Sequence, residues 1–178
     1  EDYSADGGCP VCHVFGVPGE VDSTGPTLLI VRDVLLTNES AEALEKAKPD
    51  LPFAELKTEV AIDRVTSAAT PRTLERVPAG AVFGPAELVF SIYDKADYKR
   101  LKHVVDAMQL VEDDYLGGAG SRGSGKVQFA KIKVTARARN DYGNEETFRQ
   151  FDSVQGLSQA WDELMTWAEK TVPITSKG

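Results

Sequence analysis

The sequence predicts an α+β fold, and three stretches of the chain predict it. Residues 27–36 form a nearly continuous apolar run, which is typical of a central β-strand. Residues 57–76 alternate β-branched and polar side chains on both sides of a small, polar centre, as an extended β-hairpin does. Residues 95–111 repeat apolar side chains at helical spacing and therefore predict an amphipathic helix.

Length and composition favour one domain with a locally basic region. The chain has 178 residues and 42% hydrophobic content, which is enough for a proper core. Its net charge of −8 argues against a nucleic-acid partner, but residues 117–140 contain six cations and no acid. Local charge matters more than total charge when a groove follows phosphates. Because no apolar run reaches membrane-spanning length and no signal peptide is visible, we expect no membrane partner. Two cysteines three residues apart cannot form a disulfide framework, which suits a reducing cytoplasm.

The N-terminal stretch contains a C-x-x-C motif, formed by Cys9 and Cys12. This motif is half of a tetrahedral zinc site, and His13 is poorly placed to join it. A redox motif would need a preceding strand, which the sequence does not predict, and a pair of buried thiols is the plain alternative. We expect structural zinc at Cys9 and Cys12, with the remaining ligands supplied from elsewhere. Residues 1–16 would then be the end of a zinc-binding insertion.

The first predicted strand leads into a short helix. Asn38 or Ser40 can cap a helix over residues 41–47, because both side chains accept hydrogen bonds from a first turn. A later strand over residues 81–93 is expected to break at its Gly-Pro pair.

The predicted hairpin of residues 57–76 carries Arg64, Arg72 and Arg76. Its small residues at 67–70 predict a loose tip. Two interpretations of the arginines stay open, which are phosphate contacts and the surface ion pairs that exposed charges usually form. The carboxylates available for such pairs are those of Glu59, Asp63 and Glu75.

The C-terminal part of the chain predicts one more strand and one more helix. Residues 127–129 and 132–136 alternate in opposite phase, which predicts a strand with a bulge near Ala130. After residue 143 the spacing predicts a single packing helix with acids opposite its apolar face. That face consists of Val154, Leu157, Trp161, Leu164 and Ala168.

A glycine-rich loop, residues 116–126, lies between the amphipathic helix and that strand. Its five glycines satisfy the dinucleotide fingerprint and most of a P-loop. Both motifs need a strand before the glycines and a helix after them, whereas this loop follows a helix and precedes a strand, so we reject both. The loop and its basic strand either bind a polyanion or form a tight turn before a solvated edge strand.

Several blocks of the sequence, in their order and spacing, resemble one family. The chain is similar, over about residues 12–142, to the repeated backbone RAMP subunit of type III CRISPR effector complexes, the third Csm subunit. The blocks that carry this resemblance are Val14-Phe15-Gly16, residues 27–36, Ile62-Asp63-Arg64-Val65-Thr66, Pro71-Arg72 with Glu75-Arg76, and residues 112–126.

The resemblance implies a modified ferredoxin-like, RRM-like core into which the hairpin is inserted as a thumb. Family members stack with further copies of themselves into a filament along CRISPR RNA, together with other type III effector subunits. The thumb wedges into the duplex of guide and target RNA, and the target RNA is cut at each kink with the help of Mg²⁺ or another divalent cation. The family's catalytic aspartate, first strand and first helix are expected ahead of this segment, so the resemblance gives no catalytic residue here.

The resemblance assigns RNA contacts to the hairpin and to the glycine-rich loop. It divides the chain into a RAMP core, residues 17–142, and a C-terminal helical extension, residues 143–178. The expected RNA-binding residues are Arg64, Thr66, Arg72, Arg76, Gly117, Gly118, Gly120, Ser121, Arg122, Gly123 and Lys126.

Two other functions stay open. A RAMP-type endonuclease that processes precursor CRISPR RNA would have the same fold, and such enzymes usually carry a histidine base near the RNA. His103 is expected on a helix and His13 abuts a cysteine, so neither is an attractive base. The remaining alternative is a structural RNA-binding module without catalytic activity.

Overall fold

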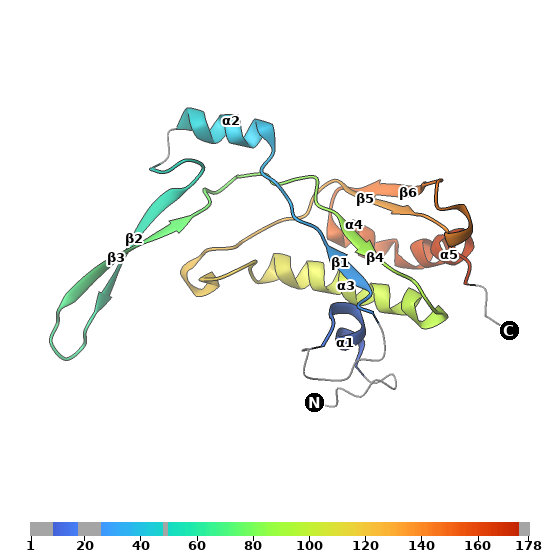
Figure 1. The fold of residues 1–178 in the computed structure, drawn as a ribbon. Helices are drawn as coiled ribbons and strands as arrows, with labels where there is room; N and C mark the ends of the chain where they lie inside the picture. Colours follow the sequence, from blue (N-terminus) through green and yellow to red (C-terminus); the bar gives the residue numbers. More distant parts are fainter. Residues whose placement is uncertain (1–8, 18–25, 48–49, 175–178) are drawn as a thin grey trace. The chain divides into compact units, whose positions relative to one another are not determined.

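The computed structural model describes residues 9–17, 26–47 and 50–174 and confirms the α+β class. The chain forms two compact units, of which unit 2 is Val31–Leu88 and unit 1 is the chain before and after it. Each unit is described by itself. The helices, labelled in Figure 1, are α1 (Pro10–Phe15), α2 (Asn38–Ala47), α3 (Lys95–Asp113), α4 (Val154–Gln159) and α5 (Trp161–Thr171). The strands are β1 (Leu29–Val31), β2 (Glu55–Ile62), β3 (Ala69–Arg76), β4 (Leu88–Phe90), β5 (Ile132–Ala136) and β6 (Glu146–Phe151).

The predicted amphipathic helix is confirmed as α3, the longest helix of unit 1. It begins with a capping box, in which the Asp94 carboxylate accepts the N–H groups of Ala96 and Asp97 while Asp97 accepts the N–H of Asp94. Such a cap is worth about 1 kcal/mol. Asp97 is only 1% exposed, and Arg100 lies 2.6 Å from its carboxylate, so this buried charge is compensated. Neither α3 nor any other described helix is long and apolar enough to cross a membrane.

The C-terminal residues supply most of the core of unit 1. The buried side chains of Val154, Leu157 and Leu164 pack with Phe151 and with Val105 of α3. Figure 1 shows the elements that surround this cluster, β5, β6, α4 and α5, in orange to red.

The prediction of one continuous final helix is wrong. The chain leaves helical geometry at Ala160 (φ −89°, ψ 14°), where the Ala160 N–H is shared between the carbonyl oxygens of Gly156 and Leu157. Two shorter helices, α4 and α5, therefore replace the single helix. Val154, Leu157 and Leu164 belong to one buried cluster across this break.

The strand expected over residues 127–136 is shorter than predicted. It begins only at Ile132, because Lys131 takes a left-handed backbone conformation (φ 55°) that interrupts the extended path. β5 pairs antiparallel with β6, a strand that the sequence did not predict. The irregularity in this pairing lies between Val134 and Thr135 and not near Ala130.

The apolar run of residues 27–36 does not form a long central strand. Only Leu29–Val31 is a strand, and it pairs with β4, while Leu36 makes an isolated bridge to Phe83. Leu35 is 77% exposed, so the run is not buried on both faces in this structure. Its composition matched a central strand, but a central strand also needs neighbours on both edges.

The helix expected over residues 41–47 is present as α2 and begins earlier. Its cap is Thr37, whose Oγ1 accepts the N–H of Ser40 at 3.3 Å, and not Asn38 or Ser40. The Ser40 side chain instead accepts the N–H of Val82 at 2.9 Å. Ser40 is buried because it ties α2 to the neighbouring segment of unit 2.

Candidate RNA interface

The predicted hairpin is confirmed in unit 2 as the strands β2 and β3. The two eight-residue strands pair antiparallel, from Glu55 opposite Arg76 to Ile62 opposite Ala69. Figure 1 shows them as an extended two-stranded ribbon with the turn at its far end. The alternation of β-branched and polar residues therefore predicted this element correctly.

The tip of the hairpin is an ordered turn over residues 63–68, so the prediction of a loose tip at 67–70 is wrong. Asp63 organises it, because its Oδ1 accepts the N–H groups of Val65 at 2.7 Å and Thr66 at 2.9 Å. The Asp63 N–H donates to the Ala68 carbonyl oxygen, and the Asp63 carbonyl oxygen accepts the N–H of Ser67, both at 2.9 Å. These bonds fix the backbone and leave the side chain of Val65 93% exposed.

The hydrogen bonds at the tip predict a pH dependence. The N–H groups of Thr66 and Val65 stabilise the ionised carboxylate of Asp63 and hold its pKa below the ordinary value of 3.8. Since the pKa of Asp63 is lower in the folded tip, the hydrogen bonds stabilise the tip fully above about pH 4. This stabilisation is lost as the pH falls through the lowered pKa. An NMR titration of the Asp63 carboxyl, followed also at the amides of Val65 and Thr66, should give a midpoint below 3.8.

The matched control for that titration is Asp63→Asn, which keeps an oxygen acceptor and removes the charge. The amides of Val65 and Thr66 should then show no transition in this pH range. A midpoint at or above 3.8 in the natural sequence would contradict the ordered tip.

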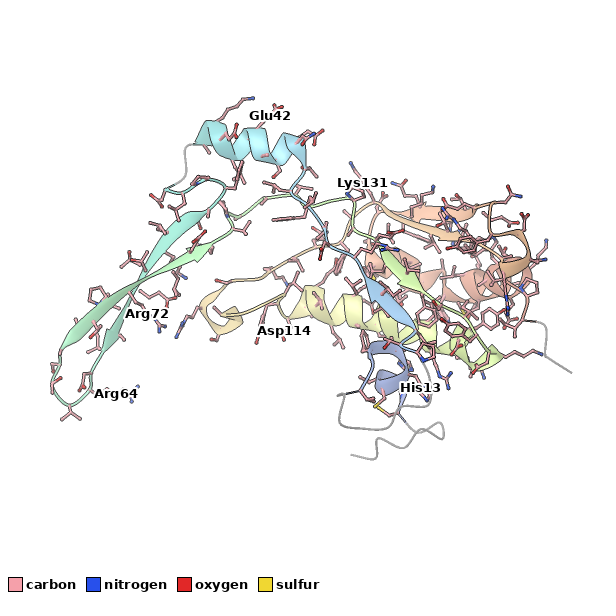
Figure 2. All side chains as sticks on the ribbon, in the orientation of Figure 1. His13, Glu42, Arg64, Arg72, Asp114 and Lys131 are labelled. Carbon is pink, nitrogen blue, oxygen red and sulfur yellow. The ribbon has the colours of Figure 1, made fainter. Side chains whose placement is uncertain are left out.

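The arginines of the hairpin differ in their partners. Arg72 lies 3.1 Å from the Glu59 carboxylate, and Arg76 pairs with Glu55. The alternative of surface ion pairs thus describes these two arginines, although Arg76 uses Glu55 and not Glu75. Arg64 is exposed at the tip, where Figure 2 labels it, and it forms no ion pair within the described residues.

The ion pairs lie on one face of the hairpin, and the other face carries exposed apolar side chains together with Thr58, Thr73 and Glu75. Residues directly opposite each other share a face, so Leu56, Val60 and Ile62 lie on the face away from Arg72 and Arg76. These three apolar side chains are 43%, 57% and 67% exposed. The hairpin therefore presents apolar side chains at its tip and toward the tip on one face, where Glu75 lies near the base, and its two ion pairs on the other face.

The glycine-rich loop of unit 1 is closed and internally packed. It follows the end of α3, near Asp114 in Figure 2, and the Leu116 N–H donates to the Gly125 carbonyl oxygen at 2.8 Å. A 3₁₀ turn spans Gly120–Arg122 within it. The ring of Tyr115 lies against Gly120, and the two are so close that any side chain at position 120 would overlap the ring.

The five glycines of the loop fall into two groups. A Cβ at Gly120 would meet Tyr115, and a Cβ at Gly125 would meet the Leu116 carbonyl oxygen, so these two glycines serve the packing of the loop itself. The space beside the remaining glycines is open, which leaves room for a ligand backbone to approach. Those open glycines are Gly117, Gly118 and Gly123.

Lys126 has a structural role that the sequence did not indicate. Its Nζ donates to the carbonyl oxygens of Glu112 and Asp113, which are acceptors at the C-terminal end of α3. The Glu112 carboxylate in turn accepts the N–H of Phe129 at 2.7 Å. The loop is thus fixed to the helix before it and to the segment after it, while Ser121 and Arg122 stay exposed in the 3₁₀ turn.

The C-x-x-C motif lies at the start of α1. Cys9 is the N-cap residue, and its Sγ accepts the N–H of Cys12 at 3.2 Å. Within residues 9–17, 26–47 and 50–174, no group of three or more cysteine, histidine or acidic side chains is arranged to hold a metal ion. Zinc at Cys9 and Cys12 stays a prediction.

The expected RNA contacts thus fall in two places. Arg64, Thr66, Arg72 and Arg76 belong to unit 2, whereas the loop residues 117–126 belong to unit 1. The roles of Asp63 and Tyr115 were not recognised in the sequence. An aspartate before a turn is a known signal, because its side chain accepts backbone N–H groups of the residues that follow. Nothing local marks Tyr115 as the support for a glycine five positions away.

Comparisons with known proteins place these features in a family. A family model described as the RAMP superfamily matches residues 2–128. The chain is 38% identical to the CRISPR system Cms endoribonuclease Csm3 of Methanocaldococcus jannaschii, over 89% of this chain and 62% of the relative. It is 39% identical to the protein of the same name from Methanothermobacter thermautotrophicus, over 85% of this chain and 67% of the relative.

A solved structure is also similar to this chain. It is the Csm3–Csm4 subcomplex of a type III-A CRISPR–Cas interference complex, which matches with a TM-score of 0.55 and 28% sequence identity. The match covers 88% of this chain and 67% of the matched chain. The chain therefore spans about two thirds or less of the length of these relatives.

Proposed function

Since this chain belongs to the RAMP superfamily, and within it to the Csm3 family, we propose that it is part of a CRISPR RNA-binding backbone subunit of a type III interference complex. In this role it positions complementary target RNA for metal-dependent cleavage at regular intervals. The observation that carries the proposal is the hairpin, whose ordered tip exposes Arg64 and Val65 at the end of two eight-residue strands.

The hairpin has the properties that a wedge between two RNA strands needs. Its tip is held by hydrogen bonds to Asp63, so little conformational entropy is lost when it enters a duplex. The apolar face around Val60 and Ile62 can lie against displaced bases, because nucleobases expose apolar rings once they are unstacked. The Arg72 and Arg76 side chains stay 46% and 38% exposed in their ion pairs, so a phosphate can approach each guanidinium beside its carboxylate.

The glycine-rich loop has the properties of a contact to the guide RNA. Gly117, Gly118 and Gly123 leave open space at their Cα atoms, which lets a sugar-phosphate backbone come close. Ser121 and Arg122 stand exposed between these glycines and supply a hydroxyl and a guanidinium for phosphate oxygens. Such contacts fix the register of an RNA and do not depend on its sequence.

The fold of the whole subunit is part of the same proposal. We assign the β1–β4 pair, α3 and the β5–β6 pair to a modified ferredoxin-like core, with β2–β3 as its inserted thumb. Further copies of the subunit in a filament and other type III subunits are the proposed partners, because a matched structure is a Csm3–Csm4 subcomplex. Cleavage with Mg²⁺ or another divalent cation is proposed for the intact protein, with the catalytic aspartate outside this segment.

The salt dependence of guide binding tests this function. Replacing Arg122 and Lys126 together by alanine should weaken the binding of guide RNA whatever its sequence. The slope of log affinity against log salt should become shallower by about 0.7 for each lost phosphate contact. Because Lys126 also caps α3, Arg122→Ala alone must be measured in parallel.

Lys99→Ala is the matched control for this measurement, since it removes an exposed cation of α3 away from the loop. It should leave the salt slope unchanged. An unchanged slope in both Arg122→Ala and the double variant would remove the loop from the guide interface.

Structural zinc is proposed for the intact protein, with Cys9 and Cys12 as two of its ligands. Their spacing at the head of α1 supports it, since both thiols lie in one helical turn. Metal analysis of the purified full-length protein should give about one zinc per C-x-x-C motif, and Cys9→Ser with Cys12→Ser should abolish it. An unchanged zinc content in that variant would exclude these two ligands.

A further inference from the structure

The β5–β6 pair has one face that packs on the core of unit 1 and one face whose side chains are exposed among the described residues of that unit. Along β5, the partly buried Ile132 and Val134 contact the core, while the alternating side chains point outward. Lys131, labelled in Figure 2, lies at the start of β5. We use the name outer face for the exposed side of β5 together with the turn that follows it, Arg139–Asp141. Its exposed cations and aromatic residue are Lys131, Lys133, Arg137, Arg139 and Tyr142.

The outer face is basic although the chain as a whole is acidic. Residues 131–145 contain four cations and two carboxylates, whereas the complete sequence has a net charge of −8. Both carboxylates are engaged locally. Glu145 lies 2.9 Å from Arg137 and 3.8 Å from Lys133, and Asp141 accepts both hydrogen bonds of the Asn144 amide. The face thus keeps an excess of positive charge after its own ion pairs are counted.

Tyr142 gives this face a feature that an ordinary edge strand lacks. It is 68% exposed, and the Arg137 guanidinium lies 5.7 Å from its ring centroid. Arg137 is itself held by Glu145, which fixes the cation beside the ring. The Arg137 guanidinium covers part of the ring, and the remaining surface is open to a flat partner.

Backbone hydrogen bonds of its own hold the loop that carries Tyr142. The Asp141 N–H donates to the Ala138 carbonyl oxygen at 3.1 Å, and the Asn144 N–H donates to the Asp141 carbonyl oxygen at 3.1 Å. Tyr142 therefore stands on a turn that is fixed on both sides. An aromatic ring held in place beside cations is the arrangement with which proteins bind single-stranded nucleic acid, because bases stack on the ring while the cations follow the phosphates.

We propose that the outer face of the β5–β6 pair is a binding site for single-stranded RNA, with one unpaired base stacked on Tyr142 and phosphates at Lys133 and Arg139. This site is separate from the glycine-rich loop. This inference rests on the proposed function in one respect, which is that the bound nucleic acid is RNA. β6 adds Thr147 and Gln150, which lie opposite Thr135 and Lys133 and provide neutral hydrogen-bonding groups along the same face.

The test uses the full-length protein loaded with guide RNA and a short fluorescein-labelled oligouridylate that does not pair with the guide. Tyr142→Leu should weaken binding of this probe about tenfold, because it removes one stacked base. Tyr142→Phe keeps the ring and should bind as the natural protein does. Lys133→Gln with Arg139→Gln should lower the salt slope by about 1.4, whereas the exposed Lys170→Gln on α5 should not change it.

A second measurement locates the contact. Photocrosslinking with a 5-iodouridine version of the same probe should label the peptide that contains Tyr142, and Tyr142→Leu should lose this product. Unchanged probe affinity in both Tyr142→Leu and the double glutamine variant overturns the proposal. The proposal is also overturned if these variants bind the probe normally but no longer bind another protein subunit of the complex, because the face would then be a protein interface.

The two proposals of RNA binding can fail separately. Arg122→Ala, measured for guide RNA in the same series, reports on the glycine-rich loop alone. If Arg122→Ala lowers the affinity for guide RNA while Tyr142→Leu does not change the affinity for the oligouridylate, the proposed function stands and the outer face does not bind RNA. The reverse pattern retains the outer face and removes the loop from the guide interface.

Discussion

Shortening the hairpin is expected to abolish regularly spaced cuts in target RNA while guide RNA stays bound and its maturation stays intact. Val60 and Pro71 are cross-strand partners, so an Asn-Gly turn can join them in place of residues 61–70 and leave the base of the hairpin paired. The shortened element keeps Arg72 and Arg76 but loses the tip that enters the duplex. Because misplacing a substrate by an ångström can cost about a hundredfold in rate, loss of the wedge should lower the cleavage rate by at least about that factor.

The measurement is a denaturing gel of labelled target RNA after incubation with the assembled complex, read beside guide RNA extracted from the same complex. Val65→Thr, which changes the exposed tip but keeps its length, is the matched control and should retain the spacing of the cuts. If the shortened hairpin instead blocks precursor processing and spares target cleavage, the protein is a processing nuclease and not a backbone subunit.

Gly125→Ala is expected to have the second largest effect, on both stability and guide binding. Gly125 has a φ of +84°, and a Cβ there would run into the Leu116 carbonyl oxygen, which is backbone and has little room to move. A left-handed residue other than glycine costs about 1–3 kcal/mol, so the free energy of unfolding should fall by at least this amount. The loop would open where the Leu116 N–H meets the Gly125 carbonyl oxygen, and guide affinity should fall tenfold or more.

Gly118→Ala separates the stability of the loop from its contact with RNA. No atom lies within 4 Å of a Cβ at this position, so the variant should unfold at the same temperature as the natural protein. A loss of guide affinity in Gly118→Ala would then come from the RNA backbone approaching that glycine. Natural stability and natural guide affinity in Gly125→Ala would contradict the close approach of Gly125 to the Leu116 carbonyl oxygen.

The hairpin and α3 could be predicted from the sequence because their signals are local. Alternation of side chains selects a strand pair, and helical spacing of apolar side chains selects a helix, without reference to the rest of the fold. The long strand over residues 27–36 was wrong for the opposite reason. Apolar composition only says that a segment can be buried, and whether it pairs on two edges is decided by distant parts of the chain.

The candidate site could be predicted only in part, because composition does not show which charged side chains form ion pairs or hydrogen bonds with each other. Residues 117–140 have no acid, yet Glu145 reaches back across the turn and neutralises part of the charge at Lys133 and Arg137. Lys126 was expected to face RNA, and the structure brings it to the C-terminal end of α3. The packing of Tyr115 against Gly120 joins residues five apart through a loop path that no local pattern describes.

The two-stranded form of the hairpin leaves it prone to edge-to-edge aggregation. In the described residues β2 and β3 pair only with each other, so the outer edge of each strand can pair through its backbone N–H and C=O groups with a strand of another molecule. Exposed Val60 and Ile62 would add to such edge-to-edge aggregation. Pro71 has no N–H to offer, and the charges at Lys57 and Arg72 oppose the stacking of like hairpins. The sixteen paired residues thus combine two open edges with side chains that oppose aggregation at those edges.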